Sequence, residues 1–143
     1  MAELATIVKG VRLAVAATLN PNLETRVNAE KGFAERSLTQ YPQLVYALCQ
    51  IVKDNASPVD DPNRQQASVL LQGIITPRDP RKREALGKKW MEQNAVFKQN
   101  VKGALFETMR LPGTAGAKLS RSAASCLAEI AVLEIPRKQW PDL

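Results

Sequence analysis

The apolar residues of the first forty positions form two stripes, each with the three- and four-residue spacing of one helix face. The first stripe extends to about Leu19 and consists of Leu4, Ile7, Val8, Val11 and Val15. Asn20 and Pro21 end it. The second stripe lies between Pro21 and Gln40, with the proline in the first turn of the helix, and consists of Leu23, Val27, Ala34 and Leu38. This spacing predicts a helical hairpin.

The same pattern occurs twice more along the chain. The second hairpin has one face made of Leu44, Val45, Leu48, Ile51 and Val52, and another made of Ala67, Leu70, Leu71, Ile74 and Ile75, with the break at 54–61 between them. The third begins with a long charged segment whose apolar residues are Leu86, Trp90, Phe97, Val101 and Leu105. We expect a bend in this segment near Met91. After the breaker 111–116, its last stripe is Leu119, Ala123, Cys126, Leu127, Ile130 and Ala131, and Pro136 ends it.

No stretch alternates apolar and polar residues in the manner of a strand, so the sequence predicts an all-α fold. The pairs start near residues 2, 42 and 80, a spacing close to the roughly 40 residues of HEAT and armadillo repeats. Stacking of the pairs would bury the stripes. We therefore expect a right-handed α-solenoid, truncated at its C-terminal end, with repeats at about 2–41, 42–77 and 80–135 and the start of a fourth at 136–143.

The composition argues against several classes of function. The chain has no histidine, the commonest acid–base group and metal ligand, and its two cysteines, Cys49 and Cys126, form no CxxC pair. We expect both thiols to be buried and reduced. The N-terminal segment, interrupted by Glu3, Lys9 and Arg12, contains neither a signal-peptide core nor a membrane span. These features indicate a cytoplasmic or nuclear protein that is not an enzyme and needs no metal or cofactor.

The net charge of +6 comes mostly from one stretch, 78–102, which contains Arg78, Arg81, Lys82, Arg83, Lys88, Lys89, Lys98 and Lys102. Such a cluster could face an acidic protein, nucleic acid or solvent. A nucleic-acid-binding helical repeat is thus one alternative, although no aromatic residues alternate with the basic ones for base stacking. A helical scaffold is another. Trp90 and Trp140 lie at apolar phases, which favours core packing over ligand stacking.

The end of the chain, Ala128–Leu143, combines an alanine-rich helix, the stop Glu134–Pro136 and the start of a further helix at Gln139–Pro141. In this combination it resembles importin-β, a nuclear transport receptor of the karyopherin-β family. Three earlier stretches match the family's first repeats in order: Ala29–Glu30 with Phe33, Gln66–Ile75, and Lys89–Lys102. One departure is Leu71–Gln72–Gly73, where the family commonly has Leu-Lys-Asn.

The resemblance implies that this is the N-terminal part of a nuclear import receptor, whose inner helices bind the small GTPase Ran in its GTP form so that cargo is released in the nucleus. It places importin-α or cargo, and FG-nucleoporins, on later repeats, and the protein in the cytoplasm, the nucleus and the nuclear pore. The candidate Ran contacts are Arg64, Gln72, Arg78, Ser122, Ser125 and Glu129. Each could equally be an ordinary solvated side chain.

Overall fold

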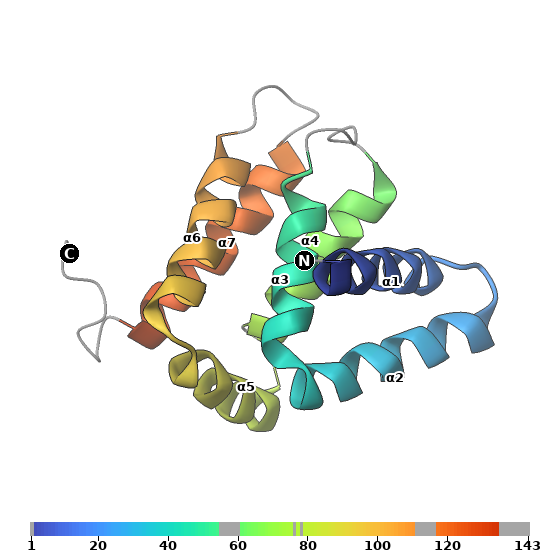
Figure 1. The fold of residues 1–143 in the computed structure, drawn as a ribbon, viewed down its shortest axis with the longest axis horizontal. Helices are drawn as coiled ribbons and strands as arrows, with labels where there is room; N and C mark the ends of the chain where they lie inside the picture. The colour runs from blue at the N-terminus through green and yellow to red at the C-terminus, as the bar shows by residue number, and fades with distance from the viewer. Residues whose placement is uncertain (1, 55–60, 76, 78, 111–116, 135–143) are drawn as a thin grey trace.

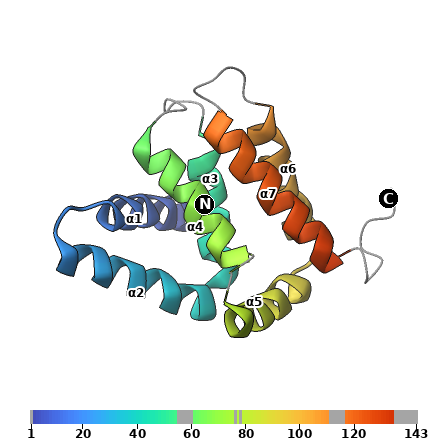
Figure 2. The same ribbon diagram turned by 180° about the vertical axis from the view of Figure 1, so that it is seen from behind.

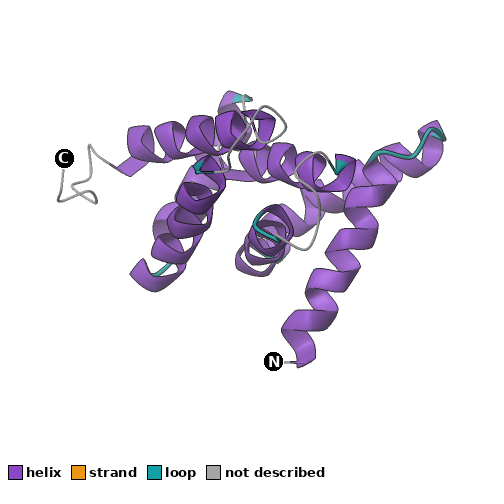
Figure 3. Cartoon of the chain, turned by 90° about the horizontal axis from the view of Figure 1, so that it is seen from above, coloured by secondary structure: helices purple, strands orange, loops and turns teal. Residues whose placement is uncertain are grey.

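The chain folds into helices alone over the residues that the computed structural model describes, which are 2–54, 61–75, 77, 79–110 and 117–134 (Figure 3). Within them the helices are α1 (Ala2–Thr18), α2 (Leu23–Thr39), α3 (Tyr41–Val52), α4 (Pro62–Ile75), α5 (Pro80–Glu92), α6 (Ala95–Met109) and α7 (Ala117–Glu134). None of these helices is both long and apolar enough to cross a lipid bilayer.

Three helical hairpins stack side by side: α1 with α2, α3 with α4, and α6 with α7 (Figure 1). In one layer α3 packs between α1 and α6, and in the other α4 packs beside α7. The short helix α5 connects α4 to α6 and packs on α4. This arrangement confirms the predicted all-α solenoid of paired helices.

Side-chain caps explain where several helices begin. Asn22, Asp79 and Asn94 lie just before α2, α5 and α6, and the side-chain oxygen of each accepts a hydrogen bond from a backbone N–H of the first turn. The cap at Asn94 accepts from the Phe97 N–H at 2.8 Å. It divides the long charged segment into two helices, so that the bend expected near Met91 is a complete break at residues 93–94. Pro21 precedes the Asn22 cap and lies outside α2, contrary to the first-turn position predicted for it.

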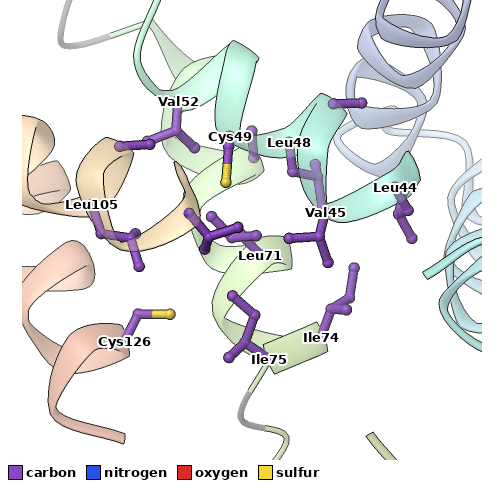
Figure 4. Close-up of a cluster of buried hydrophobic side chains, with 14 of the residues drawn as sticks. Leu44, Val45, Leu48, Cys49, Val52, Leu71, Ile74, Ile75, Leu105 and Cys126 are labelled. Carbon is purple, nitrogen blue, oxygen red and sulfur yellow. The ribbon is translucent and has the colours of Figure 1, made fainter. Parts of the chain in front are cut away.

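The core is centred on α3, which is buried on several sides because it packs against α1, α2, α4 and α6. Its predicted stripe is at most 2% exposed and consists of Leu44, Val45, Leu48, Ile51 and Val52. The stripe of α4 packs against it, and most of the buried residues of α7 belong to the same apolar cluster (Figure 4). Cys49 and Cys126 are buried and unpaired, as expected. Burial raises the pKa of each thiol to about 12, so both are neutral at pH 7.

The predicted stripe of α2 is mostly not part of the core. Leu23 and Leu38 are 63% and 55% exposed, and Ala34 is exposed as well. The residues that α2 buries are Phe33 and Ser37. The physical reason is position: α2 packs mainly on α1 and α3, and α4 does not pack closely enough against α2 to cover its stripe (Figure 2). Helical spacing therefore predicted the helix correctly and its burial incorrectly.

A buried polar cluster joins α5, α6 and the end of α7. Trp90 is fully buried, as expected, and its indole N–H donates to the Glu134 carboxylate at 2.8 Å. The Lys102 ammonium lies 2.5 Å from the other oxygen of the same carboxylate. The Lys98 side chain is also buried and donates to the Met91 carbonyl at 3.0 Å. The prediction for Trp140 falls outside the described residues.

Candidate functional site

A polar seam follows the line where α4 packs against α7, the second helices of their hairpins. Figure 2 shows these two helices side by side. Ser68 and Gln72 are four residues apart on α4, and Ser122 and Ser125 are three apart on α7. Residues at these spacings lie on one face of a helix. We call these four residues the α4–α7 seam.

The four side chains of the seam form a continuous chain of hydrogen bonds. The Ser68 hydroxyl donates to Ser122 Oγ at 2.7 Å, and the Ser122 hydroxyl lies 3.4 Å from Gln72 Oε1. The Gln72 amide then donates to Ser125 Oγ at 2.9 Å. Exposure increases along the chain, from buried Ser68 to exposed Ser125. The inner bonds therefore hold the two helices in register, while the outer residues face solvent.

An ion pair extends this surface toward α5. The Arg83 guanidinium lies 2.7 Å from the Glu129 carboxylate, and both side chains are partly exposed. Glu129 is one turn beyond Ser125 on α7. Gln72, Ser122, Ser125 and Glu129, predicted from two separate helices, thus form one continuous surface that presents hydroxyl, amide and charged groups to solvent. Groups of this kind can hydrogen-bond to a protein partner.

Arg64 is not part of this surface. Its side chain is only 2% exposed, and its Nε donates to the carbonyl of Val52, the last residue of α3, at 2.7 Å. A carbonyl at a helix C-terminus has no partner within its own helix, so Arg64 satisfies one of these groups. Burial lowers the pKa of the guanidinium, against the opposite effect of Asp54 and Asp61. The structure thus places this candidate Ran contact in the interior. Arg78, the other arginine candidate, lies outside the described residues.

Two residues that bind to members of this surface were not predicted. Ser68 precedes Gln72 by four residues on the same helix, and this spacing is a signal that could have identified it. Arg83 lies 46 residues from Glu129 in sequence, and only the tertiary fold brings the two together. In the sequence Arg83 was one of eight cations in the basic stretch 78–102.

The basic stretch does not form one continuous charged face. Arg83 pairs with Glu129, Lys102 pairs with Glu134, and Lys98 is buried against a backbone carbonyl. Of the seven cations of this stretch that the structure describes, these three therefore bind groups of the protein itself. Such an arrangement is less suited to a run of phosphate contacts than the sequence implied. Among the described residues no cluster of acidic or cysteine side chains could hold a metal ion.

Comparison with known proteins identifies the family. No protein-family profile matches the chain. The importin subunit beta-1 of Schizosaccharomyces pombe is 32% identical over 130 residues, which is 90% of this chain and 14% of that protein. The chain belongs to the importin-β family. The importin subunit beta-1 of Arabidopsis thaliana is 24% identical over 115 residues, 77% of this chain and 13% of its own length.

Solved structures of importin-β proteins share this fold. A crystal structure of importin beta matches 94% of this chain and 15% of its own with a TM-score of 0.81 at 27% identity. A structure of Kap95p, a protein whose binding induces the switch loops of RanGDP to adopt the GTP-bound conformation, matches 99% of this chain and 16% of its own with a TM-score of 0.74 at 21% identity. The chain thus spans about one seventh of the length of the importin-β relatives that it matches.

Proposed function

We propose that this chain is part of a nuclear import receptor and that its α4–α7 seam, with Glu129, contacts Ran in the GTP-bound form. The observation that supports this most directly is the assembly of Gln72, Ser122, Ser125 and Glu129 on one surface. The family resemblance suggested these residues as Ran contacts before their arrangement in space was known. Kap95p, which has the same fold, engages Ran.

The seam could recognise Ran through hydrogen bonds and charge. Ser125 Oγ accepts a bond from Gln72, and its own hydroxyl hydrogen, which makes no bond to another described residue, can donate to a carbonyl or carboxylate of Ran. Glu129 and Arg83 supply one charge of each sign at the edge of the seam. A rigid, pre-formed surface of this kind loses little side-chain entropy on binding.

The mechanism we propose is linkage between two binding events. Ran binding at these repeats would weaken cargo binding on later repeats of the full-length protein, and cargo would weaken Ran binding by the same factor. Importin-α or cargo, and FG-nucleoporins, are the partners that we assign to those later repeats. The receptor would then work in the cytoplasm, the nucleus and the nuclear pore, by binding and without catalysis.

A nucleotide-dependent binding experiment tests the proposal. The immobilised 143-residue chain is titrated with Ran loaded with GTP or with GDP, and we expect at least about tenfold tighter binding of the GTP form, about 1.4 kcal/mol. Equal binding of the two forms, or none by a chain that circular dichroism shows to be helical, would refute the proposal.

One substitution and a matched control then locate the contact. Ser125→Arg places a large cation on the exposed end of the seam and removes the acceptor of the Gln72 bond, so affinity for GTP-loaded Ran should fall by about tenfold or more. Gln99→Arg adds the same charge at an exposed position of α6, in the other layer, and should leave affinity unchanged. If the two variants bind Ran equally well, the seam is not the contact.

The Gln72–Gly73 departure can be tested in the same assay. The family commonly has lysine and asparagine at these two positions. In this chain the Gln72 amide donates to Ser125, a bond that a lysine ammonium could also make, though with a full positive charge. If this position faces an acidic part of Ran, Gln72→Lys should strengthen binding of the GTP form. No change in affinity would mean that the difference from the family at this position does not affect Ran binding.

A further inference from the structure

An apolar groove lies on the other side of α4 from the seam, between α4, α2 and α5. It has a volume of about 590 Å³, and apolar side chains line it, among them Phe33 and Leu38 from α2, Val69 and Ile74 from α4, and Leu86 from α5. We call it the three-helix groove. Its size is within the range of sites that hold side chains of a partner or a small ligand.

Large apolar side chains are exposed in this groove. Leu38 from α2 and Val69 from α4 both line it, and they are 55% and 58% exposed. Gly73 lines it as well, and apart from its chain neighbours and the nearby backbone of α4 no atom comes within 4 Å of the position that a Cβ there would occupy. Exposed apolar residues gathered on one concave surface mark binding sites more often than those scattered singly. The groove therefore has the character of a docking site.

The charged residues at the rim are distributed unequally. Arg81 and Lys82 lie on the α5 side, and Glu30 lies on the α2 side. All three are exposed, and none forms an ion pair with another described residue. The rim therefore carries two positive charges along one edge and one negative charge along the other. A partner that fits should carry the opposite signs on its two flanks.

We propose that the three-helix groove binds an amphipathic helix of a partner protein, which inserts an apolar stripe between α2 and α4 and turns acidic residues toward Arg81 and Lys82. Helices commonly bind in apolar grooves through side chains at positions i, i+3, i+4 and i+7. A second copy of this chain suits the groove less well, because a net charge of +6 opposes the approach of another basic molecule to a basic rim. This proposal does not depend on Ran binding at the seam.

A pair of designed peptides tests both the shape and the charge of this occupant. Each labelled peptide has about 18 residues, enough to form a helix, with a leucine stripe flanked on one side by glutamate in the first and by lysine in the second. Fluorescence anisotropy with the complete chain should show roughly tenfold tighter binding of the glutamate peptide. Equal affinity for the two peptides, or binding of neither, would overturn the proposal.

Substitutions of the rim residues and of Val69 test whether the peptides bind in this groove. Arg81→Glu with Lys82→Glu should reverse the preference between the two peptides, and Val69→Asp should remove binding of both. Val96→Asp, at a 66% exposed position on α6, is the matched control and should change nothing. If Val69→Asp binds as the unchanged chain does, the peptides bind elsewhere and the proposal fails. Concentration-dependent dimers that Val69→Asp abolishes would show that a second copy fills the groove, which also contradicts it.

Discussion

The helices α2 and α7 are each the second helix of a hairpin, yet they differ greatly in what they bury. Along α7 the buried residues are Leu119, Ala123, Cys126, Leu127, Ile130 and Glu134, whereas α2 buries Phe33 and Ser37. Both carry an apolar stripe with helical spacing. The difference must therefore come from their surroundings and not from the local pattern of residues.

The placement of the neighbouring helices relative to each stripe explains the contrast. α7 packs against both α6 and α4, so its stripe is enclosed on two sides. α2 packs mainly on α1 and α3, and the C-terminal part of its stripe lines the three-helix groove, where Ala34 and Leu38 remain exposed. In a stack of hairpins an apolar face is buried only where a neighbouring element covers it. The stripe of α2 is thus available for binding, and that of α7 is committed to the fold.

The largest expected difference concerns stability. Ile130→Ala removes a fully buried side chain from α7 and should lower the free energy of unfolding by roughly 2–5 kcal/mol. Leu38→Ala removes an exposed side chain of similar size from α2 and should change it by no more than about 0.5 kcal/mol. Urea titrations followed by circular dichroism measure both values. Losses of equal size would show that α2 is packed as closely as α7 in solution.

A smaller loss of stability should appear at alkaline pH. It comes from the buried thiols of α3 and α7, whereas α2 has no cysteine. The folded-state pKa of Cys49 and Cys126 is about 12, above an ordinary value of 9.0. Because burial keeps each thiol neutral in the folded state, the unfolded chain ionises first as the pH rises. The contribution of each thiol to the free energy of unfolding is therefore complete below about pH 9 and is lost as the pH rises toward 12. At pH 10 the loss should be on the order of 1 kcal/mol for each thiol.

The control for this prediction is a variant that lacks both thiols. Cys49→Ala with Cys126→Ala starts from a lower stability, because two buried sulfurs are removed, but its urea midpoint should depend less on pH between 9 and 10. Tyr41 is also buried, and burial raises its pKa above the usual value, so its contribution is lost only at still higher pH in both proteins. Parallel pH profiles for the two proteins would show that the thiols do not cause the loss.

The smallest expected effect concerns the edge of the seam. Arg83→Gln breaks the ion pair with Glu129, and because both side chains are partly exposed, the free energy of unfolding should fall by less than about 1 kcal/mol. Added salt should reduce the difference further, since it screens exposed charges. Thermal unfolding at low and high ionic strength measures it. A loss of several kcal/mol would mean that this pair, and not the packing of α7, fastens α5 to the fold.

Much of the fold could be predicted from spacing because a helix is a local structure. The stripe of α3 is buried as predicted, and so is that of α7 except for the partly exposed Ala131, since neighbouring helices cover them. The stripe of α2 was predicted just as clearly and lies mostly exposed, because burial also depends on which helices lie beside it. The break at residues 93–94 was expected as a bend near Met91, whereas the Asn94 cap begins a separate helix.

The candidate site could be predicted only in part. Gln72, Ser122 and Ser125 lie on the polar sides of two helices, which the sequence shows, but the relative rotation of α4 and α7 that joins them is a tertiary property. Arg64 illustrates the opposite case. A charged residue on a helix is usually solvated, yet here the end of α3 provides a buried carbonyl for it. Neither the Ser125 hydroxyl that Gln72 binds nor the Val52 carbonyl that Arg64 binds could be inferred from residues close by in sequence.

The order of the hairpins along the chain also has a consequence for protein synthesis. α1 leaves the ribosome before α3, and the last of the α3 residues that cover it follows about 2–7 seconds later at about 5–20 residues per second. Until then the nascent hairpin exposes Val11 and Val15, which are buried in the finished fold. A stretch of exposed apolar surface on a growing chain is the kind of target that chaperones bind. The first hairpin thus depends on protection from aggregation until α3 has been synthesised.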